Sequence, residues 1–447
     1  MLKLLVPIHL FFVGLFGFSF INIQEDSHEM TICKTIDVSV NHKGGNIASN
    51  FGDSPIEIDP NKSYTLPTLA KNNKGEVVLY WTEKDPQNEA ALYFATSKDG
   101  KTYAEKKLVF ADAGLGNGRL ARPKLLFKKN GEMVAIFSYR VGATPPREAR
   151  PTTQTQEATH NNHNAPASQQ VPAARPKRSS EIRFTVSKDG GNTWSTPTSV
   201  DTDTTKLTRG FFDAVVLPND EVAVAYLKDV KGSTKFEERD LRLVITKNGV
   251  FQPERLIDPV VCDCCNISMV VDEAGALHMV YRDNNNDIRD MAHIVSKDNG
   301  ATFSAPKTLY ADKWEIKGCP HSGATSASTK TDQFITWFSG TQNGQSGVRL
   351  TNASGKLLKV LDSSAKNASI AADDKTAVWV WEQIAENGPS NIFYSKVING
   401  KLLDSQKVAS SDFGQNASTL VVNGKVLVAY EVLKADKKTV LAAKFVE

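Results

Sequence analysis

One short motif occurs three times in this chain and limits the folds that it can adopt. Residues 97–103, 187–194 and 296–303 share the pattern Ser-x-Asp-x-Gly-x-Thr-aromatic, and the first copy is one residue short. In a tight turn, the Asp carboxylate accepts backbone N–H groups and the Gly supplies a positive φ. Because each copy joins two apolar, strand-like segments, the motif predicts a repeated β-hairpin in which Asp99, Asp189 and Asp298 are structural.

The remainder of the chain repeats with the same hairpin pattern. Seven units of roughly 45–55 residues each contain an inner strand, a turn, and a second and third strand, which is the size of a propeller blade. The inner strands begin near Pro67, Pro123, Asp213, Asn266, Ala324, Ala368 and Ala417. The sequence therefore predicts an all-β fold, a β-propeller of seven four-stranded blades, with six blades as the alternative.

Two segments depart from the regular repeat. The last unit ends after its third strand, and an unpaired edge strand invites aggregation. We therefore expect residues 36–41 or 55–58 to supply the fourth strand and close the ring. Residues 141–180 are rich in Pro, Thr, Gln, Ala, Asn and Arg, which predicts a disordered or lid-like insertion. Its His160 and His163 fit solvated loop residues better than metal ligands.

The repeated motif resembles the Asp-box, or bacterial neuraminidase (BNR) repeat, of the sialidase-like β-propellers, and the resemblance covers most of residues 64–408. Sialidases carry an Arg-Ile-Pro segment in the first blade, an arginine triad that clamps the substrate carboxylate, a Tyr-Glu pair and an Asp acid/base. Here Thr65 stands in place of the first-blade arginine, and the nearest Arg-Pro pair, Arg122-Pro123, lies one blade later. The resemblance therefore implies the fold more strongly than the activity.

Whether the protein is an enzyme is left open by the sequence. If it is one, the resemblance implies a glycoside hydrolase of sialidase type that acts on an acidic sugar. Arginines from several blades suit a carboxylate or phosphate ligand. The candidate catalytic residues are Arg122, Tyr281, Arg282 and Asp283.

Connectivity assigns the cysteines to one face of the ring. The links between successive blades lie on the face opposite the Asp-box turns. One link carries Cys262, Cys264 and Cys265 into the fourth blade, and the next carries Cys319 and His321 into the fifth. Since these are equivalent links of neighbouring blades, we expect the five side chains to converge. Both links resemble those of a cysteine-bearing branch of exported bacterial Asp-box proteins.

Three interpretations of this convergence are open. Thiolates with an imidazole suit a soft metal ion, copper(I) or zinc(II), with Asp263 or Asp283 orienting the ligands. Structural disulfides would instead make the chain a non-catalytic module that binds glycan or protein. The adjacent pair Cys264-Cys265 also permits redox chemistry. The metal interpretation comes first because a disulfide needs no imidazole beside it.

Charge and the N-terminus bear on partners and compartment. The chain has 53 Lys and Arg against 50 Asp and Glu, a net charge of +3, which indicates neither nucleic acid nor an anionic membrane as partner. Residues 4–23 are a nearly uncharged apolar run, which predicts a signal peptide over 1–23 or a retained N-terminal anchor. Residues 24–447 are then one propeller domain. Both alternatives predict export to the periplasm, the cell surface or the medium.

Overall fold

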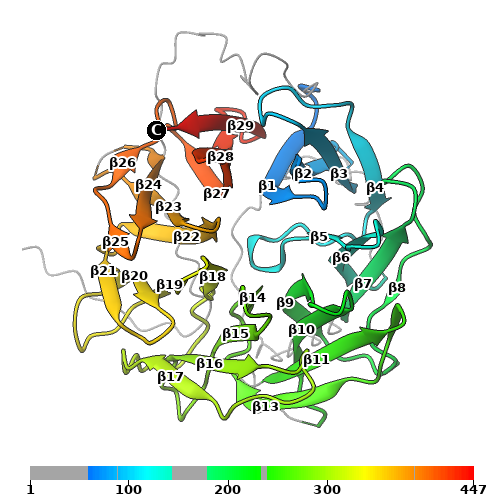
Figure 1. Cartoon of the computed structure of the whole chain (residues 1–447), viewed down its shortest axis with the longest axis horizontal. Coiled ribbons are helices and arrows are strands. Elements are labelled where there is room, and N and C mark those ends of the chain that lie inside the picture. The colour runs from blue at the N-terminus through cyan, green and yellow to red at the C-terminus, as the bar shows by residue number, and fades with distance from the viewer. Residues whose placement is uncertain (1–58, 88, 143–178, 233–238, 387) are drawn as a thin grey trace, which may run out of the picture. The chain divides into compact units, whose positions relative to one another are not determined.

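Seven β-sheets stand in a ring around a common axis (Figure 1). This computed structural model describes residues 59–87, 89–142, 179–232, 239–386 and 388–447. The prediction of an all-β propeller is confirmed, with seven blades rather than six. In these ranges the only helix is the single 3-10 turn η1 (Arg119–Ala121). Thus the described chain has no helix of the length and apolarity that a bilayer span requires.

Within each blade, consecutive strands pair antiparallel from the axis outwards. The first three blades contain β1 (Ser63–Lys71), β2 (Val77–Lys84), β3 (Ala90–Ser97) and β4 (Lys107–Asp112); β5 (Lys124–Phe127), β6 (Met133–Arg140), β7 (Ser180–Ser187) and β8 (Thr198–Ser199); β9 (Arg209–Val216), β10 (Val222–Asp229), β11 (Arg239–Lys247) and β13 (Arg255–Val261). The next two contain β14 (Ser268–Val271), β15 (Leu277–Arg282), β16 (Met291–Ser296) and β17 (Lys307–Tyr310); β18 (Thr325–Ser328), β19 (Gln333–Ser339), β20 (Gly347–Asn352) and β21 (Leu357–Val360). The last two contain β22 (Ala365–Ala372), β23 (Thr376–Ile384), β24 (Ser390–Ile398) and β26 (Gln406–Lys407); β27 (Gly414–Val422), β28 (Lys425–Leu433) and β29 (Thr439–Val446). Two short strands, β12 (Val250–Phe251) and β25 (Lys401–Leu402), extend β11 and β24.

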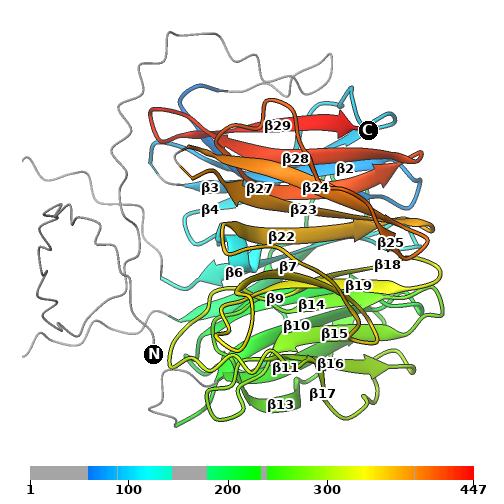
Figure 2. The same cartoon turned by 90° about the vertical axis from the view of Figure 1, so that its left-hand side faces the viewer.

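The second strand of a blade is buried on both faces because each sheet packs between two neighbours. All but the last residue of β2 and of β10 are buried. The first five residues of each of these strands form a continuous apolar run rather than an alternating pattern. Seen from the edge of the ring, the strands cross its thickness, so that turns and links gather at its two faces (Figure 2).

The ring closes where the first blade meets the seventh. β1 and β27 lie side by side (Figure 1). The backbone N–H of Leu66 donates to Glu431 Oε1 at 2.6 Å, and that of Leu69 donates to Ser418 Oγ at 3.1 Å. Side chains of both blades also share one buried core, which includes Tyr64, Leu79, Trp81, Leu427 and Leu441. Packing between β1 and β27 therefore joins the two ends of the ring.

Several predictions fall on residues outside the described ranges. These are the signal peptide or anchor at 1–23, the closing strand at 36–41 or 55–58, and nearly all of the insertion at 141–180 with His160 and His163. The seventh blade shows three strands among the residues that the structure describes.

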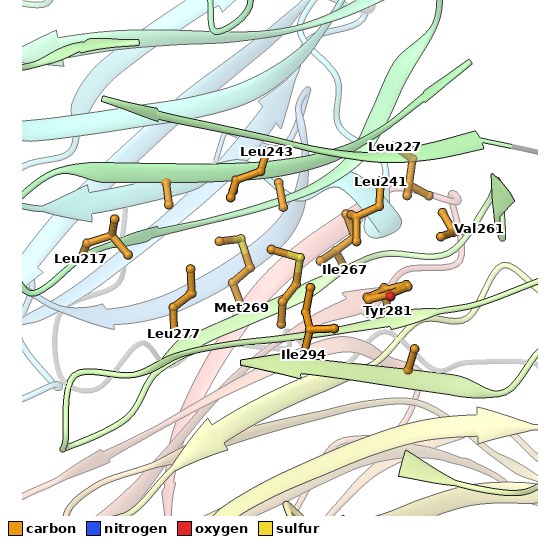
Figure 3. Close-up of a cluster of buried hydrophobic side chains, with 14 residues drawn as sticks. Leu217, Leu227, Leu241, Leu243, Val261, Ile267, Met269, Leu277, Tyr281 and Ile294 are labelled. Atoms are coloured by element: carbon orange, nitrogen blue, oxygen red, sulfur yellow. The ribbon is translucent and has the colours of Figure 1, made fainter. Parts of the chain in front are cut away.

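The core between the third and fourth blades fixes both ends of the first cysteine-bearing link (Figure 3). Val261 precedes the cysteines, Ile267 follows them, and both side chains are buried in this core with Leu241 and Tyr281. Because the two flanking residues are held in the core, the link between them has little freedom to move.

The three Asp-box turns form hairpins between the third and fourth strands. Asp298 Oδ1 accepts the backbone N–H of Thr302 at 2.9 Å and the Ser296 hydroxyl at 2.7 Å, and Asp99 and Asp189 make the same bonds in their own turns. Each turn also touches the preceding blade: a Cβ added to Gly300 would lie 2.6 Å from Ile245 Cδ1. These turns therefore help to set the spacing of the blades.

Candidate metal centre

The link between β13 and β14 places three sulfur atoms together. The Cys262 Sγ lies 3.6 Å from the Cys265 Sγ and 4.0 Å from the Cys264 Sγ. All three side chains are buried, at 1–3% exposure, and Phe211 packs against them. The three thiols therefore face one another, shielded from solvent.

The link between β17 and β18 brings two further ligand atoms to the same place. The Sγ atoms of Cys264 and Cys319 and a ring nitrogen of His321 lie within 4.8 Å of one another. Cys319 and His321 are exposed, and the Cys319 thiol donates to Asp263 Oδ1 at 3.4 Å. The five residues brought together will be called the thiol–imidazole cluster: Cys262, Cys264, Cys265, Cys319 and His321.

Close backbone approach joins the two links. The Gly323 N–H donates to Asn266 Oδ1 at 3.0 Å, and Asn266 Nδ2 donates to the Ala324 carbonyl at 2.9 Å. A Cβ added at Gly323 would overlap the Asn266 carbonyl oxygen and lie 2.6 Å from Asn266 Oδ1. The side-by-side packing of the two links thus requires glycine at this position.

Arg282 holds the second link in place. Its buried guanidinium donates to the carbonyl oxygens of Arg289 at 2.6 Å, Ser322 at 2.7 Å and Phe338 at 2.8 Å. It also lies 4.9 Å from the centre of the Trp314 ring. These donors are directed at backbone carbonyls, so the side chain positions the loop rather than facing a cavity.

Arg239 orients the first link, a role that the sequence analysis missed. Its Nη1 donates to the Asp263 carbonyl at 2.7 Å, and its Nε donates to Asp229 Oδ1 at 2.9 Å. The guanidinium carbon lies 5.4 Å from the centre of the Phe211 ring, which covers the sulfurs. β11 therefore holds both the cysteine turn and its apolar cover.

The surroundings favour a thiolate at one position of the cluster. Burial raises the pKa of Cys265, but hydrogen bonds from Cys262 and Cys264, the charge of Arg282 and the Ser322 backbone N–H outweigh it and hold the pKa well below its usual value. The pKa of Cys264 is raised by its hydrogen bonds to the neighbouring thiols and by burial. The cluster thus stabilises negative charge on sulfur at Cys265.

Tyr281 and Asp283 make structural contacts near the cluster. The Tyr281 hydroxyl donates to Asp258, and burial raises the pKa of this tyrosine. A bond from the second strand of one blade to an aspartate in or just after the last strand of the preceding blade occurs three times, in Tyr226–Asp201, Tyr281–Asp258 and Trp337–Asp312. Asp283 accepts the backbone N–H of Asn284 at 2.7 Å within its own loop.

A cavity of about 300 Å³ lies in the central channel, beside the second link. Residues of the inner strands of all seven blades line it, and Ser322 and Gly323 form part of its wall. Its charged lining residues are Arg119, Arg122, Lys124 and Asp213. The cavity therefore has an excess of positive charge.

The cavity cations differ in how firmly they are held. Arg122 donates to the Pro67 carbonyl at 3.1 Å and to the Asn416 carbonyl at 2.9 Å, so it ties three blades together. Lys124 pairs with Asp213 at 2.6 Å. Arg119 makes one longer bond, 3.3 Å to the carbonyl oxygen of His321. Of the candidate catalytic residues, Arg122 alone lines the cavity.

Comparison with known proteins gives one family and one fold. The BNR repeat-like domain matches residues 168–402, and no curated protein matches the chain. A Dyadobacter fermentans protein of unknown function is 15% identical, with 75% of this chain and 95% of that one covered and a TM-score of 0.47. The intramolecular trans-sialidase of Ruminococcus gnavus is 12% identical, and the match covers 90% of this chain and 98% of that one with a TM-score of 0.47. A PL25 ulvan lyase is 10% identical, and the match covers 89% of this chain and 97% of that one with a TM-score of 0.51.

Proposed function

This chain belongs to the BNR repeat-like domain family, and we propose that its sialidase-like β-propeller serves to bind a soft metal ion in the thiol–imidazole cluster. The observation that carries the proposal is the convergence of four sulfurs and one imidazole from two separate links. Random placement of five cysteines along 447 residues would rarely bring four of them to one point.

The donor set favours copper(I) or zinc(II). Thiolate and imidazole are the preferred ligands of both ions. Two sulfurs bound at about 2.3 Å to one tetrahedral ion lie roughly 3.8 Å apart, and the measured separations of 3.6 and 4.0 Å bracket that value. Asp263, which accepts the Cys319 thiol, is placed to orient that ligand.

The proposed setting is outside the cytoplasm, because residues 4–23 have the character of a signal peptide or anchor. Disulfides are the alternative in that compartment. The four described cysteines are free, and the sulfurs of Cys262 and Cys265, at 3.6 Å, are well beyond the bond length of about 2.05 Å. The cluster is therefore arranged for ligation more than for cross-linking.

Metal analysis paired with thiol counting tests the proposal. The full chain, reduced and kept free of oxygen, should take up at least one equivalent of copper(I) or zinc(II), and bound metal should protect the cluster thiols from alkylation. Cys264→Ser should lose most of the uptake, whereas Cys33→Ser, which alters none of the five cluster residues, should keep it and is the matched control. Absence of stoichiometric uptake, or two intact disulfides among the four cysteines of the unreduced protein, would contradict the proposal.

A second candidate function is the binding of an acidic glycan in the central cavity. The excess of positive charge on the cavity wall favours it, and about 300 Å³ is at the lower end of ligand pockets. The PL25 ulvan lyase was solved bound to -[GlcA(1-4)Rha3S]-, which makes uronate-containing oligosaccharides the first ligands to try beside sialosides. No nucleic acid partner is proposed.

A panel of fluorogenic sialosides and uronate oligosaccharides tests the glycan proposal. Arg119→Ala should weaken binding about tenfold, since one charge-assisted contact contributes about 1.5 kcal/mol. Arg140→Ala, an exposed arginine at the end of β6, is the control. If no member of the panel binds or is hydrolysed, the cavity has another role.

A further inference from the structure

The thiol–imidazole cluster consists of two overlapping sets of ligands. The inner triad is Cys262, Cys264 and Cys265, and the outer triad is Cys264, Cys319 and His321. Within each triad the ligand atoms lie within 4.8 Å of one another. The five side chains thus form two groups of three rather than one group of five, and the Cys264 sulfur belongs to both.

This arrangement determines how many ions the cluster can hold. Two ligands of one ion, at about 2.3 Å each, can lie no more than about 4.6 Å apart. Two groups of three joined at a single sulfur therefore suit two ions better than one. We propose that the cluster holds two copper(I) ions, one in each triad, with the Cys264 thiolate as the bridge between them. This inference rests on the proposed function.

Coordination number favours copper(I) over zinc(II) for two ions. Structural zinc is almost always four-coordinate, whereas each triad offers three ligands, two or three of them soft thiolates of the kind that selects copper(I). On binding, each thiol releases its proton to solvent. Four thiolates carry four negative charges, and two copper(I) ions neutralise two of them. Arg119 and Arg282 add positive charge near Cys265.

The two positions differ in access to solvent. The inner triad is buried beneath Phe211, whereas Cys319 and His321 of the outer triad are exposed. An ion from solution therefore meets the outer triad first and reaches the inner triad through the shared sulfur. The outer ion should exchange quickly and the inner ion slowly, which suits a protein that captures copper and hands it on.

Anaerobic titration of the reduced full chain with copper(I), against a chromophoric copper(I) chelator, tests the inference. We expect two ions per chain, removed by excess chelator in two phases. His321→Asn and Cys319→Ser should each lose the outer ion and its fast phase. Asparagine tolerates the left-handed backbone of His321, at φ 49°, so the first variant removes the imidazole without backbone strain.

X-ray absorption at the copper edge tests the bridge itself. Copper–copper scattering should appear at two equivalents and should be absent from Cys264→Ser. A wild-type chain that binds one ion, without copper–copper scattering, overturns the two-ion inference and leaves the proposed function standing. A chain that binds zinc(II) but no copper(I) overturns the two-ion inference alone, and a chain that binds neither ion overturns both. Two ions that still scatter from each other in Cys264→Ser would overturn the bridging role of this sulfur.

Discussion

The two faces of the ring are built in different ways. On one face, each Asp-box turn is held by bonds within seven or eight consecutive residues, such as those from Thr302 and Ser296 to Asp298. On the other, the second link of the thiol–imidazole cluster is held in place by contacts between residues 40 to 58 positions apart, such as Arg282 with Ser322 and Asn266 with Ala324.

This difference shows which structures a local sequence pattern can specify and which structures form only when the blades have packed into the ring. An Asp-box turn can form as soon as its hairpin forms, because the sequence separation of its bonds is small. The cluster can form only after the third, fourth and fifth blades have packed. Variants on the cluster face should therefore alter metal uptake, whereas variants of the Asp-box turns should alter stability alone.

Arg282→Ala should give the largest effect. It removes the donor to one buried carbonyl oxygen, that of Arg289, and two partly buried ones, those of Ser322 and Phe338, and buried unpaired groups are costly. The free energy of unfolding should fall by about 3 kcal/mol or more, and copper uptake by the folded fraction should fall with it. Chemical denaturation and copper titration measure the two quantities.

Arg209→Ala is the matched control for this experiment. Arg209 is also buried and donates to the carbonyls of Leu207 at 2.9 Å and Asp203 at 2.7 Å, but these lie in the link before β9, outside both cysteine-bearing links. It should destabilise the fold and leave copper uptake of the folded protein unchanged. Equal loss of uptake in both variants would mean that general destabilisation, and not the position of the second link, controls the cluster.

Gly323→Ala should give a smaller loss of stability and a selective loss of metal. The added Cβ overlaps the Asn266 carbonyl and must push the two links apart, at a cost of about 1–3 kcal/mol. The outer triad, which spans both links, should lose its ion, while the inner triad, which lies in one link, should keep its own. Copper stoichiometry should fall from two to one.

Gly318→Ala tests whether any alanine in the second link has this effect. A Cβ there meets nothing closer than Ile316, at 4.0 Å. This variant should bind copper like the parent protein. Full occupancy in Gly323→Ala would show that the close approach of the two links is not needed for the outer triad.

The sequence contained enough information to predict the blades and the meeting of the two cysteine-bearing links. Strand-length apolar runs and turn residues define each blade locally, and equivalent links of neighbouring blades must lie near each other once the ring is closed. The closing strand was predicted on residues outside the described ranges.

The contacts around the cluster were harder to predict. Arg282 was a candidate for ligand binding, yet its donors meet backbone carbonyls, because its surroundings depend on how three blades pack. Tyr281 was also a candidate, and here a signal was present in the sequence. The aromatic residue follows its aspartate by 25, 23 and 25 residues in Tyr226–Asp201, Tyr281–Asp258 and Trp337–Asp312, a near-constant spacing that marks a structural repeat.

Asp298→Asn should give the smallest effect and complete the contrast between the faces. Hydrogen bonds from the Thr302 side chain and backbone and from Ser296 lower the pKa of Asp298 from 3.8 to about 2. The ionised carboxylate therefore stabilises the fold above pH 3.8, and that contribution is lost as the pH falls towards 2. The variant should have a slightly lower Tm at neutral pH, a shallower fall in stability across this acid range, and unchanged copper uptake.

Acid unfolding followed by circular dichroism measures the slope, with Asp404→Asn, an exposed aspartate outside the Asp-box turns, as the control. An altered copper stoichiometry in Asp298→Asn would show that the two faces are coupled through the blade, contrary to the independence argued here.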